Sequence, residues 1–113
     1  MRLGEKQEQF DKLLPILVLK AHQMGDETRM GDSFRDPRVF GPIGVSKGYG
    51  HARSCHKYKL AQDVNLFKDG VFLQETIDHL ELGLFWETLH PLCRWGGRFN
   101  DGNHYSLEHN GSM

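Results

Sequence analysis

Two short polar stretches, far apart in the chain, contain the side-chain types that proteins use to bind metals. The first, "SCHKYKLAQD" at 54–63, contains His56 and Asp63, and the second, "DGNH" at 101–104, contains His104. Imidazole nitrogens and carboxylate oxygens are zinc ligands, and a catalytic zinc site usually combines three protein ligands with one water. His56, Asp63 and His104 are therefore a candidate zinc-binding set.

The second stretch also carries a carboxylate that can act on a proton. Asp101 precedes His104 by three residues, and Gly102 between them permits a tight turn. Such a turn would hold the carboxylate beside the metal without coordinating it. A carboxylate in that place can take a proton from a water molecule and pass it to a leaving amine. Asp101 is thus a candidate general base.

Two predicted strands would bring these residues together. Residues 60–67 alternate, with Leu60, Val64 and Leu66 on one face and Asp63 on the other, beside Ala61, Asn65 and Phe67. Gln62 is expected to face away from the metal. Residues 104–108 are predicted as a last strand. If that strand pairs beside 60–67, His104 can reach the metal that Asp63 binds. "KDG" at 68–70 is predicted as a turn.

Two helices and a long loop complete the predicted domain. Residues 5–24 carry one apolar stripe, although Pro15 predicts either a kink or a helix that starts near it. Residues 78–90 carry a second stripe, and Asp78 and Glu81 have capping-box spacing. Residues 27–34 favour a short strand, and the two Pro and four Gly of 35–53 indicate a long loop. This order predicts one α+β domain over 1–113, with the zinc site on the face of a small antiparallel sheet.

Composition narrows the classes of function. The chain has 113 residues, 38% of them apolar, and a net charge of −1, which does not favour a nucleic-acid binder. The cations between 53 and 68 are interpreted as a solvated rim. Cys55 and Cys93 form no CxxC pair, and a reduced compartment is the simpler interpretation. The polar N-terminus does not resemble a signal peptide, and no apolar run reaches membrane-spanning length. We expect a monomer that stays in the cytoplasm unless another factor releases it.

The two motifs together resemble a known family. "SCHKYKLAQD" is similar to the S-x-H-x6-D motif of the zinc D-alanyl-D-alanine carboxypeptidase and L-alanyl-D-glutamate endopeptidase family, and "DGNH" to its D/E-x-x-H motif. "FRDPR" at 34–38 looks like the Arg-containing segment upstream. "WGGRFNDGNHYSLEH" resembles the short phage endolysin branch, in which the whole protein is the peptidase. The resemblance covers about residues 27 to 109.

The resemblance implies a role for each matching residue. His56, Asp63 and His104 correspond to the zinc ligands, and Asp101 to the general base. Arg35 corresponds to the Arg that stabilises the substrate carbonyl or oxyanion, with Arg38 as a rival for that role. Ser54 corresponds to a hydrogen-bonding residue near the substrate or the first ligand. Lys59 departs from the Gly that the family often has there, and this affects the path of the loop rather than the ligands.

Two aromatic residues of the second motif are candidates for the substrate groove. Trp95 is predicted to contact substrate, whereas core packing is favoured for Phe99. The fold and activity that the resemblance implies are those of a zinc peptidase that cuts peptidoglycan stem peptides, with the bond between L-Ala and D-Glu favoured. It would act as an endolysin on the host cell wall, after release from the host cytoplasm through a separate membrane pore.

Two alternatives remain open from the sequence. A D-alanyl-D-alanine carboxypeptidase would use the same ligands, and the difference between the two activities would lie in the pocket shape at loop 36–53. A non-catalytic zinc-stabilised binding module or structural phage protein would use the same fold. Asp101 argues against that alternative, because a purely structural site needs no base and is usually closed by four ligands.

Overall fold

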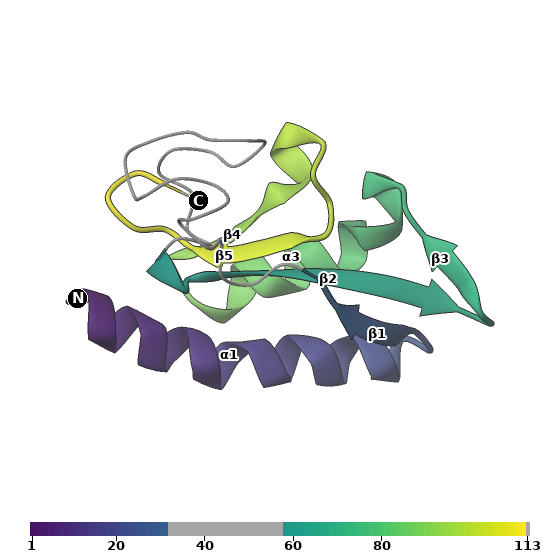
Figure 1. Ribbon diagram of the computed structural model, residues 1–113, viewed down its shortest axis with the longest axis horizontal. Coiled ribbons are helices and arrows are strands. Elements are labelled where there is room, and N and C mark those ends of the chain that lie inside the picture. Colours follow the sequence, from purple (N-terminus) through teal and green to yellow (C-terminus); the bar gives the residue numbers. More distant parts are fainter. Residues whose placement is uncertain (32–57, 113) are drawn as a thin grey trace, which may run out of the picture.

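The computed structural model describes residues 1–31 and 58–112 as two helices, two short 3-10 helices and five strands. Arg35, Ser54, His56 and the predicted loop 35–53 lie outside these residues. In chain order the elements are α1 (Leu3–Gln23), β1 (Glu27–Met30), β2 (Ala61–Lys68), β3 (Val71–Leu73), η2 (Thr76–His79), α3 (Leu80–Leu89), β4 (Cys93–Trp95), η3 (Gly96–Phe99) and β5 (His104–Leu107). Figure 1 shows β2 running through the centre of the molecule. The predicted α+β class is confirmed.

Helix α1 is continuous through Pro15, so the predicted start near that proline is wrong. The apolar stripe explains this, because it has buried members both before and after Pro15: Phe10, Leu13, Leu17 and Ala21. Pro15 itself lies on the exposed side of the helix. Burial of the stripe offsets the backbone hydrogen bond that proline cannot make, because tertiary packing provides most of a helix's stability.

The second helical region begins earlier than predicted and in a different form. A 3-10 turn, η2, leads directly into α3, so the regular α-helix starts at Leu80. The predicted cap from Asp78 to Glu81 is wrong. Asp78 instead accepts a hydrogen bond from the backbone N–H of Glu75, at 3.1 Å to Oδ2. The capping interaction therefore belongs to η2, because Asp78 lies at its third helical position.

The sheet is antiparallel, with the strand order β1-β2-β5-β4 and with β3 also paired to β2. Along β2, Ala61–Asp63 pair with β5 and Leu66–Lys68 pair with β3. Strand β1 pairs with the other edge of β2. The predicted turn at 68–70 is confirmed, with Asp69 and Gly70 at positive φ. The last strand, β5, pairs with β2, which is the condition that the predicted zinc site requires.

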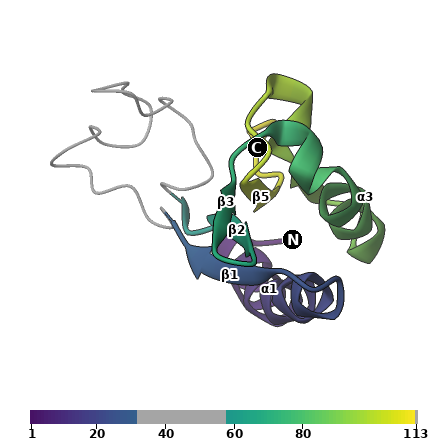
Figure 2. The same ribbon diagram turned by 90° about the vertical axis from the view of Figure 1, so that its right-hand side faces the viewer.

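Both helices cover one face of the sheet, as Figure 2 shows. The rings of Phe10 in α1 and Tyr105 in β5 meet that of Trp86 in α3 edge to face, at centroid distances of 5.8 and 6.1 Å. Val64 and Leu66 of β2 are fully buried in the same core. Because side chains alternate along a strand, Asp63 and His104 lie on the face away from the helices. No helix in the part of the chain that the structure describes is both long and apolar enough to cross a membrane.

Candidate metal centre

Asp63 and His104 face each other across two paired strands. They are direct Cα partners in the pairing of β2 with β5. The Nδ1 atom of His104 lies 3.6 Å from the Oδ1 atom of Asp63, and the two side chains are 9% and 16% exposed. A carboxylate and an imidazole, separated by 41 positions in the sequence, therefore meet at one place on the sheet.

Each of these two side chains lies against a glycine. A Cβ atom at Gly31 would be 3.2 Å from the Cβ of Asp63, and one at Gly96 would be 2.8 Å from the Cβ of His104. The Gly31 N–H also donates to the Asp63 carbonyl at 2.7 Å. The space that the two candidate ligands occupy thus depends on the absence of a side chain at both glycines.

The turn that carries Asp101 is fixed by backbone hydrogen bonds at both ends. The Asp101 N–H donates to the Gly96 carbonyl at 3.0 Å, and the His104 N–H donates to the Asp101 carbonyl at 3.1 Å. The Val64 N–H donates to the Asn103 carbonyl at 2.8 Å, which ties the turn to β2. The Asp101 side chain is exposed. The candidate base is therefore accessible, while its backbone is held in a defined position relative to His104.

The buried side chain of Trp95 holds this turn in place through a hydrogen bond and through ring packing. Its indole Nε1–H donates to the Gly102 carbonyl at 2.7 Å, and the residue is 6% exposed. A Cβ atom at Gly83 or Gly97 would lie 2.1 or 2.3 Å from the indole ring, so the ring packs directly against both glycines. The substrate contact predicted for Trp95 stays a prediction. The indole ring contacts Gly102 in the turn, Gly83 in α3 and Gly97 in η3.

Phe99 differs from what the sequence predicts. Its side chain is 69% exposed, so the favoured core packing is wrong. The reason is local, because Phe99 ends the short helix η3 and Asn100 follows it in the left-handed conformation, with φ of 58°. The aromatic side chain of this segment that packs into the core is that of Trp95.

Glu87 of α3 joins this arrangement to the helix layer. Its Oε2 atom accepts a hydrogen bond from the Trp95 backbone N–H at 3.1 Å, and its Oε1 atom lies 3.1 Å from Nη2 of Arg98. Arg98 is largely exposed, so the ion pair contributes little to stability. The bond to the backbone of Trp95 fixes the start of η3 and hence the direction of the following loop.

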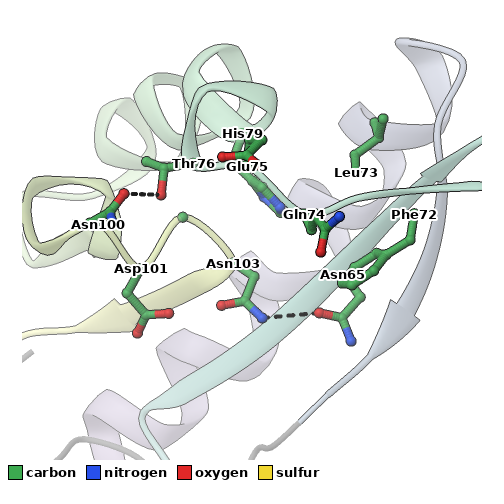
Figure 3. A pocket seen from close by; sticks show the side chains of 11 residues that line it. Asn65, Phe72, Leu73, Gln74, Glu75, Thr76, His79, Asn100, Asp101 and Asn103 are labelled. Carbon is green, nitrogen blue, oxygen red and sulfur yellow. Dashed lines mark hydrogen bonds between the residues drawn. The ribbon is translucent and has the colours of Figure 1, made fainter.

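A polar pocket lies on the side of the turn that faces η2, in the gap between β3 and β5 along β2. It encloses about 140 Å³ and is lined by Asn65, residues 72–76, His79 and residues 100–103. Figure 3 shows two hydrogen bonds at its rim. Thr76 Oγ1 donates to Asn100 Oδ1 at 3.0 Å, and Asn103 Nδ2 donates to Asn65 Oδ1 at 3.0 Å.

His79 forms the inner wall of this pocket. It is 3% exposed, and its Nδ1 atom lies 2.8 Å from the hydroxyl of Tyr105. Burial lowers the pKa of His79 below 6.5, against the opposing effect of the nearby carboxylates of Asp78 and Asp26. Burial also raises the pKa of Tyr105. Both groups are therefore neutral at pH 7, and the inner wall carries no charge.

Several predicted site residues lie outside the described residues: Arg35, Arg38, Ser54 and His56. Within residues 1–31 and 58–112, no group of three His, Cys, Asp or Glu side chains is placed to hold a metal ion. The set of three zinc ligands and the oxyanion-stabilising Arg therefore stay predictions. Two members of the predicted site, Asp63 and His104, are brought together, and Asp101 lies three residues from His104 in the same turn.

The two residues fit zinc by the chemistry of their donor atoms. Carboxylate oxygen and imidazole nitrogen belong to the ligand set that zinc uses in catalytic sites. A Cβ at Gly31 or Gly96 would crowd the Asp63 or His104 side chain, so both candidate ligands need a glycine beside them. Both side chains are also largely buried, so each is held in few orientations.

Sequence reasoning missed the residues that hold the site together. Gln62 is 6% exposed, and its Nε2 atom donates to the carbonyls of Gly31 and Asp63 at 3.1 and 2.9 Å. The strand alternation predicts only that Gln62 and Asp63 point to opposite faces. It gives no sign of the hydrogen bond from Gln62 to Gly31, the residue that follows β1. The role of Gly31 had no signal in the sequence beyond the presence of glycine itself, whereas Gly96 belongs to the glycine-containing stretch from which a tight turn near the metal is expected.

No protein-family model, no curated protein and no solved structure matches this chain. The resemblance described above therefore rests on its motifs alone.

Proposed function

We propose that this protein is a zinc-dependent peptidase that hydrolyses peptidoglycan stem peptides, as a phage endolysin does, at the bond between L-Ala and D-Glu. The observation that carries the proposal is the cross-strand pair of Asp63 and His104, with Nδ1 and Oδ1 3.6 Å apart and Asp101 in the turn that ends at His104. Two donor types for zinc thus meet on one sheet face, and a further carboxylate, that of Asp101, belongs to the turn that leads to one of them.

In this proposal Asp63 and His104 bind the zinc ion together with His56. Zinc supplies Lewis-acid polarisation of the peptide carbonyl and makes a water molecule a stronger nucleophile at neutral pH. The remaining chemistry belongs to the chain. Asp101 takes the proton from the attacking water and delivers it to the amine that leaves. Its exposed carboxylate, on a backbone fixed by hydrogen bonds, suits a group that must meet both substrate and water.

A structural role for the metal would leave Asp101 without a function. A structural zinc site is usually closed by four protein ligands, and catalytic sites retain an open position. Asp101 is exposed and its residue lies at the edge of a pocket, so its carboxylate is accessible to substrate and water. The proposed site of action is the host cell wall, reached from the cytoplasm through a separate membrane pore.

The test compares the zinc-loaded protein with its Asp101→Asn variant on purified Gram-negative peptidoglycan, with mass analysis of the fragments. We expect the wild type to release fragments with new amino termini on D-Glu, whereas cleavage of the terminal D-Ala alone would identify a carboxypeptidase. Removing a general base costs about 10²- to 10⁴-fold in rate. The variant should keep its zinc affinity, because Asp101 is not a proposed ligand.

Asp11→Asn serves as the matched control, since Asp11 is an exposed carboxylate on α1, away from the sheet face. It should cut at the wild-type rate. Asp63→Ala and His104→Ala should lose zinc as well as activity. The proposal fails if the zinc-loaded wild type releases no fragment, or if Asp101→Asn cuts as fast as the Asp11→Asn control.

A further inference from the structure

The sheet face that carries Asp63 continues along two strands with further polar and aromatic side chains. Asn65 and Phe67 follow Asp63 on the same face of β2, because side chains alternate along a strand. Arg29 of β1, the strand beside β2 in Figure 1, is the Cα partner of Asn65 and therefore shares this face. Its side chain is exposed. A cation thus lies on the same face as the candidate metal ligands, one strand away.

The guanidinium group of Arg29 is oriented by stacking on an aromatic pair. Its Cζ atom lies 4.1 Å from the centroid of the Phe67 ring, and that ring stacks on Phe72 at 5.2 Å with an interplanar angle of 25°. Stacking uses the flat face of a guanidinium and leaves the N–H donors at its edge available. Within residues 1–31 and 58–112, Arg29 takes part in no ion pair. Its position is therefore defined, while its donors can still accept a ligand.

Asn65 and Gly31 lie between Asp63 and Arg29. Asn103 donates to the Oδ1 atom of Asn65 (Figure 3), so the amide group of Asn65 is oriented by its acceptor side and its Nδ2 donors stay available. A Cβ atom at Gly31 would be 3.2 Å from the Cβ of Asp63 and 3.4 Å from Nδ2 of Asn65. Gly31 thus places no side chain beside these donors. Along this strip the chain presents neutral N–H donors first and charged ones after them.

This order of donors suits a peptide that ends in a carboxylate. A neutral amide donor matches a peptide carbonyl, and the fork of a guanidinium matches the two oxygens of a carboxylate. Glu27 is the Cα partner of Phe67 and so shares the face with Arg29. No ion pair joins Glu27 to Arg29 in the part of the chain that the structure describes. Glu27 therefore weakens the attraction for an anion without occupying the donors.

The separation along the strand sets where the carboxylate would lie in a substrate. Phe67, which carries the guanidinium on its ring, is four residues beyond Asp63 on β2, a distance of about 13 Å. An extended peptide has the same rise of about 3.3 Å per residue, so it would span this distance with three to four residues. The terminal carboxylate of a peptide belongs to the half that leaves as an amine.

We propose that Arg29 binds the terminal carboxylate of the substrate's leaving half, about three residues from the bond that is cut, while Asn65 donates to a carbonyl between them. The position of the cut rests on the proposed peptidase function, whereas the preference for a carboxylate rests on Arg29 and Asn65. The protein would thus favour stem peptides with a free carboxyl end over those whose end is joined to a neighbouring chain.

The test measures binding of the leaving half by NMR, so it does not depend on cleavage. γ-D-Glutamyl-L-alanyl-D-alanine and its terminal carboxamide differ only in the group that Arg29 would bind. With zinc-loaded wild-type protein, we expect the free acid to bind about fivefold tighter, the effect of one exposed ion pair. Added salt should reduce this preference. The side-chain amide signals of Asn65 should shift with both peptides.

Arg29→Gln removes the charge and should make the two affinities equal. Glu27→Gln removes the carboxylate on the same face, so the preference should rise to about tenfold. Arg2→Gln is the matched control, because Arg2 is exposed at the N-terminus of α1, and it should keep the fivefold preference. Equal affinities of the wild type for the two peptides, or a preference that survives Arg29→Gln, would overturn the inference.

The two proposals can fail separately. Cleavage of peptidoglycan together with equal affinities for the two peptides would leave the peptidase standing and remove the carboxylate site. A preference for the free acid that Arg29→Gln abolishes, without any cleavage, would support the carboxylate site and refute the peptidase.

Discussion

Replacing Gly96 by alanine tests the arrangement of the Asp101 turn directly. A Cβ atom at position 96 would lie 2.3 Å from the Asp101 carbonyl oxygen and 2.8 Å from the Cβ of His104. Close C···O contacts in proteins are about 3.3–3.6 Å long, so the carbonyl would have to move by roughly 1 Å. It cannot rotate away easily, because it accepts the hydrogen bond from the His104 N–H.

The expected cost follows from this overpacking. Forcing one additional carbon into a filled site costs about 1–3 kcal/mol, which lowers the Tm of a domain of this size by roughly 4–12 °C. The displacement also moves His104, so zinc affinity should fall about tenfold, as it does when the groups that support a metal ligand are changed. Thermal unfolding followed by circular dichroism and zinc titration measure the two effects.

Gly4→Ala is the control for this substitution. Gly4 lies in the first turn of α1 with nothing within 4 Å of an added Cβ, so the same chemical change meets open space there. It should leave zinc affinity unchanged and raise stability by up to about 1 kcal/mol, because alanine favours helix more than glycine does. If Gly96→Ala retains the wild-type Tm, the turn is not packed against Gly96 as described and the reasoning is refuted.

Three further results are expected. Trp95→Phe removes the indole donor to the buried Gly102 carbonyl, and it should lower the free energy of unfolding in urea by about 1–3 kcal/mol; an unchanged midpoint would contradict the supporting role of this bond. Burial lowers the pKa of His79 below 6.5, so the unfolded state takes up a proton before the folded state does, and stability should decline as pH falls below 6.5. His79→Gln should show a shallower decline below pH 6.5 when urea midpoints are compared, and parallel slopes would show that His79 is not the group concerned. Burial raises the pKa of Cys93 to about 12, so in a Cys55→Ser background this thiol should react with a thiol reagent at pH 8 only after unfolding; fast reaction of the folded protein would contradict its burial.

The strongest local patterns in the sequence predicted the elements that carry the site. Alternation over 60–67 gave the strand, its buried face and the opposite face with Asp63, since period-2 patterning is itself the signature of a half-buried strand. The stripe from Phe10 to Ala21 likewise predicted a helix. The start expected near Pro15 was wrong, because tertiary burial of the stripe outweighs the local cost of that proline. These features depend on near neighbours in the chain, and the sequence therefore contains them directly.

The short elements around the site could not be predicted in the same way. Strands β3 and β4 have three residues each, too few for an alternating pattern to stand out. The placement of Trp95 depends on Gly83, in another element, and on Gly102, beyond η3. The pocket combines residues from β2, β3, η2 and the loop before β5. Such features arise only from contacts between distant segments.

The pairing of β2 on both edges has a consequence for hydrogen exchange. Backbone amides of the sheet centre, such as that of Val64, which donates to the Asn103 carbonyl, open only in rare unfolding events. The Glu75 amide, by contrast, donates to an exposed side-chain cap on η2 and should exchange through small local openings. Protection from hydrogen exchange would thus be high for the amides of β2 next to Asp63 and low for the amides of η2 at the rim of the pocket. Any adjustment to a ligand would then occur in the rim, while the strands that hold Asp63 and His104 remain closed.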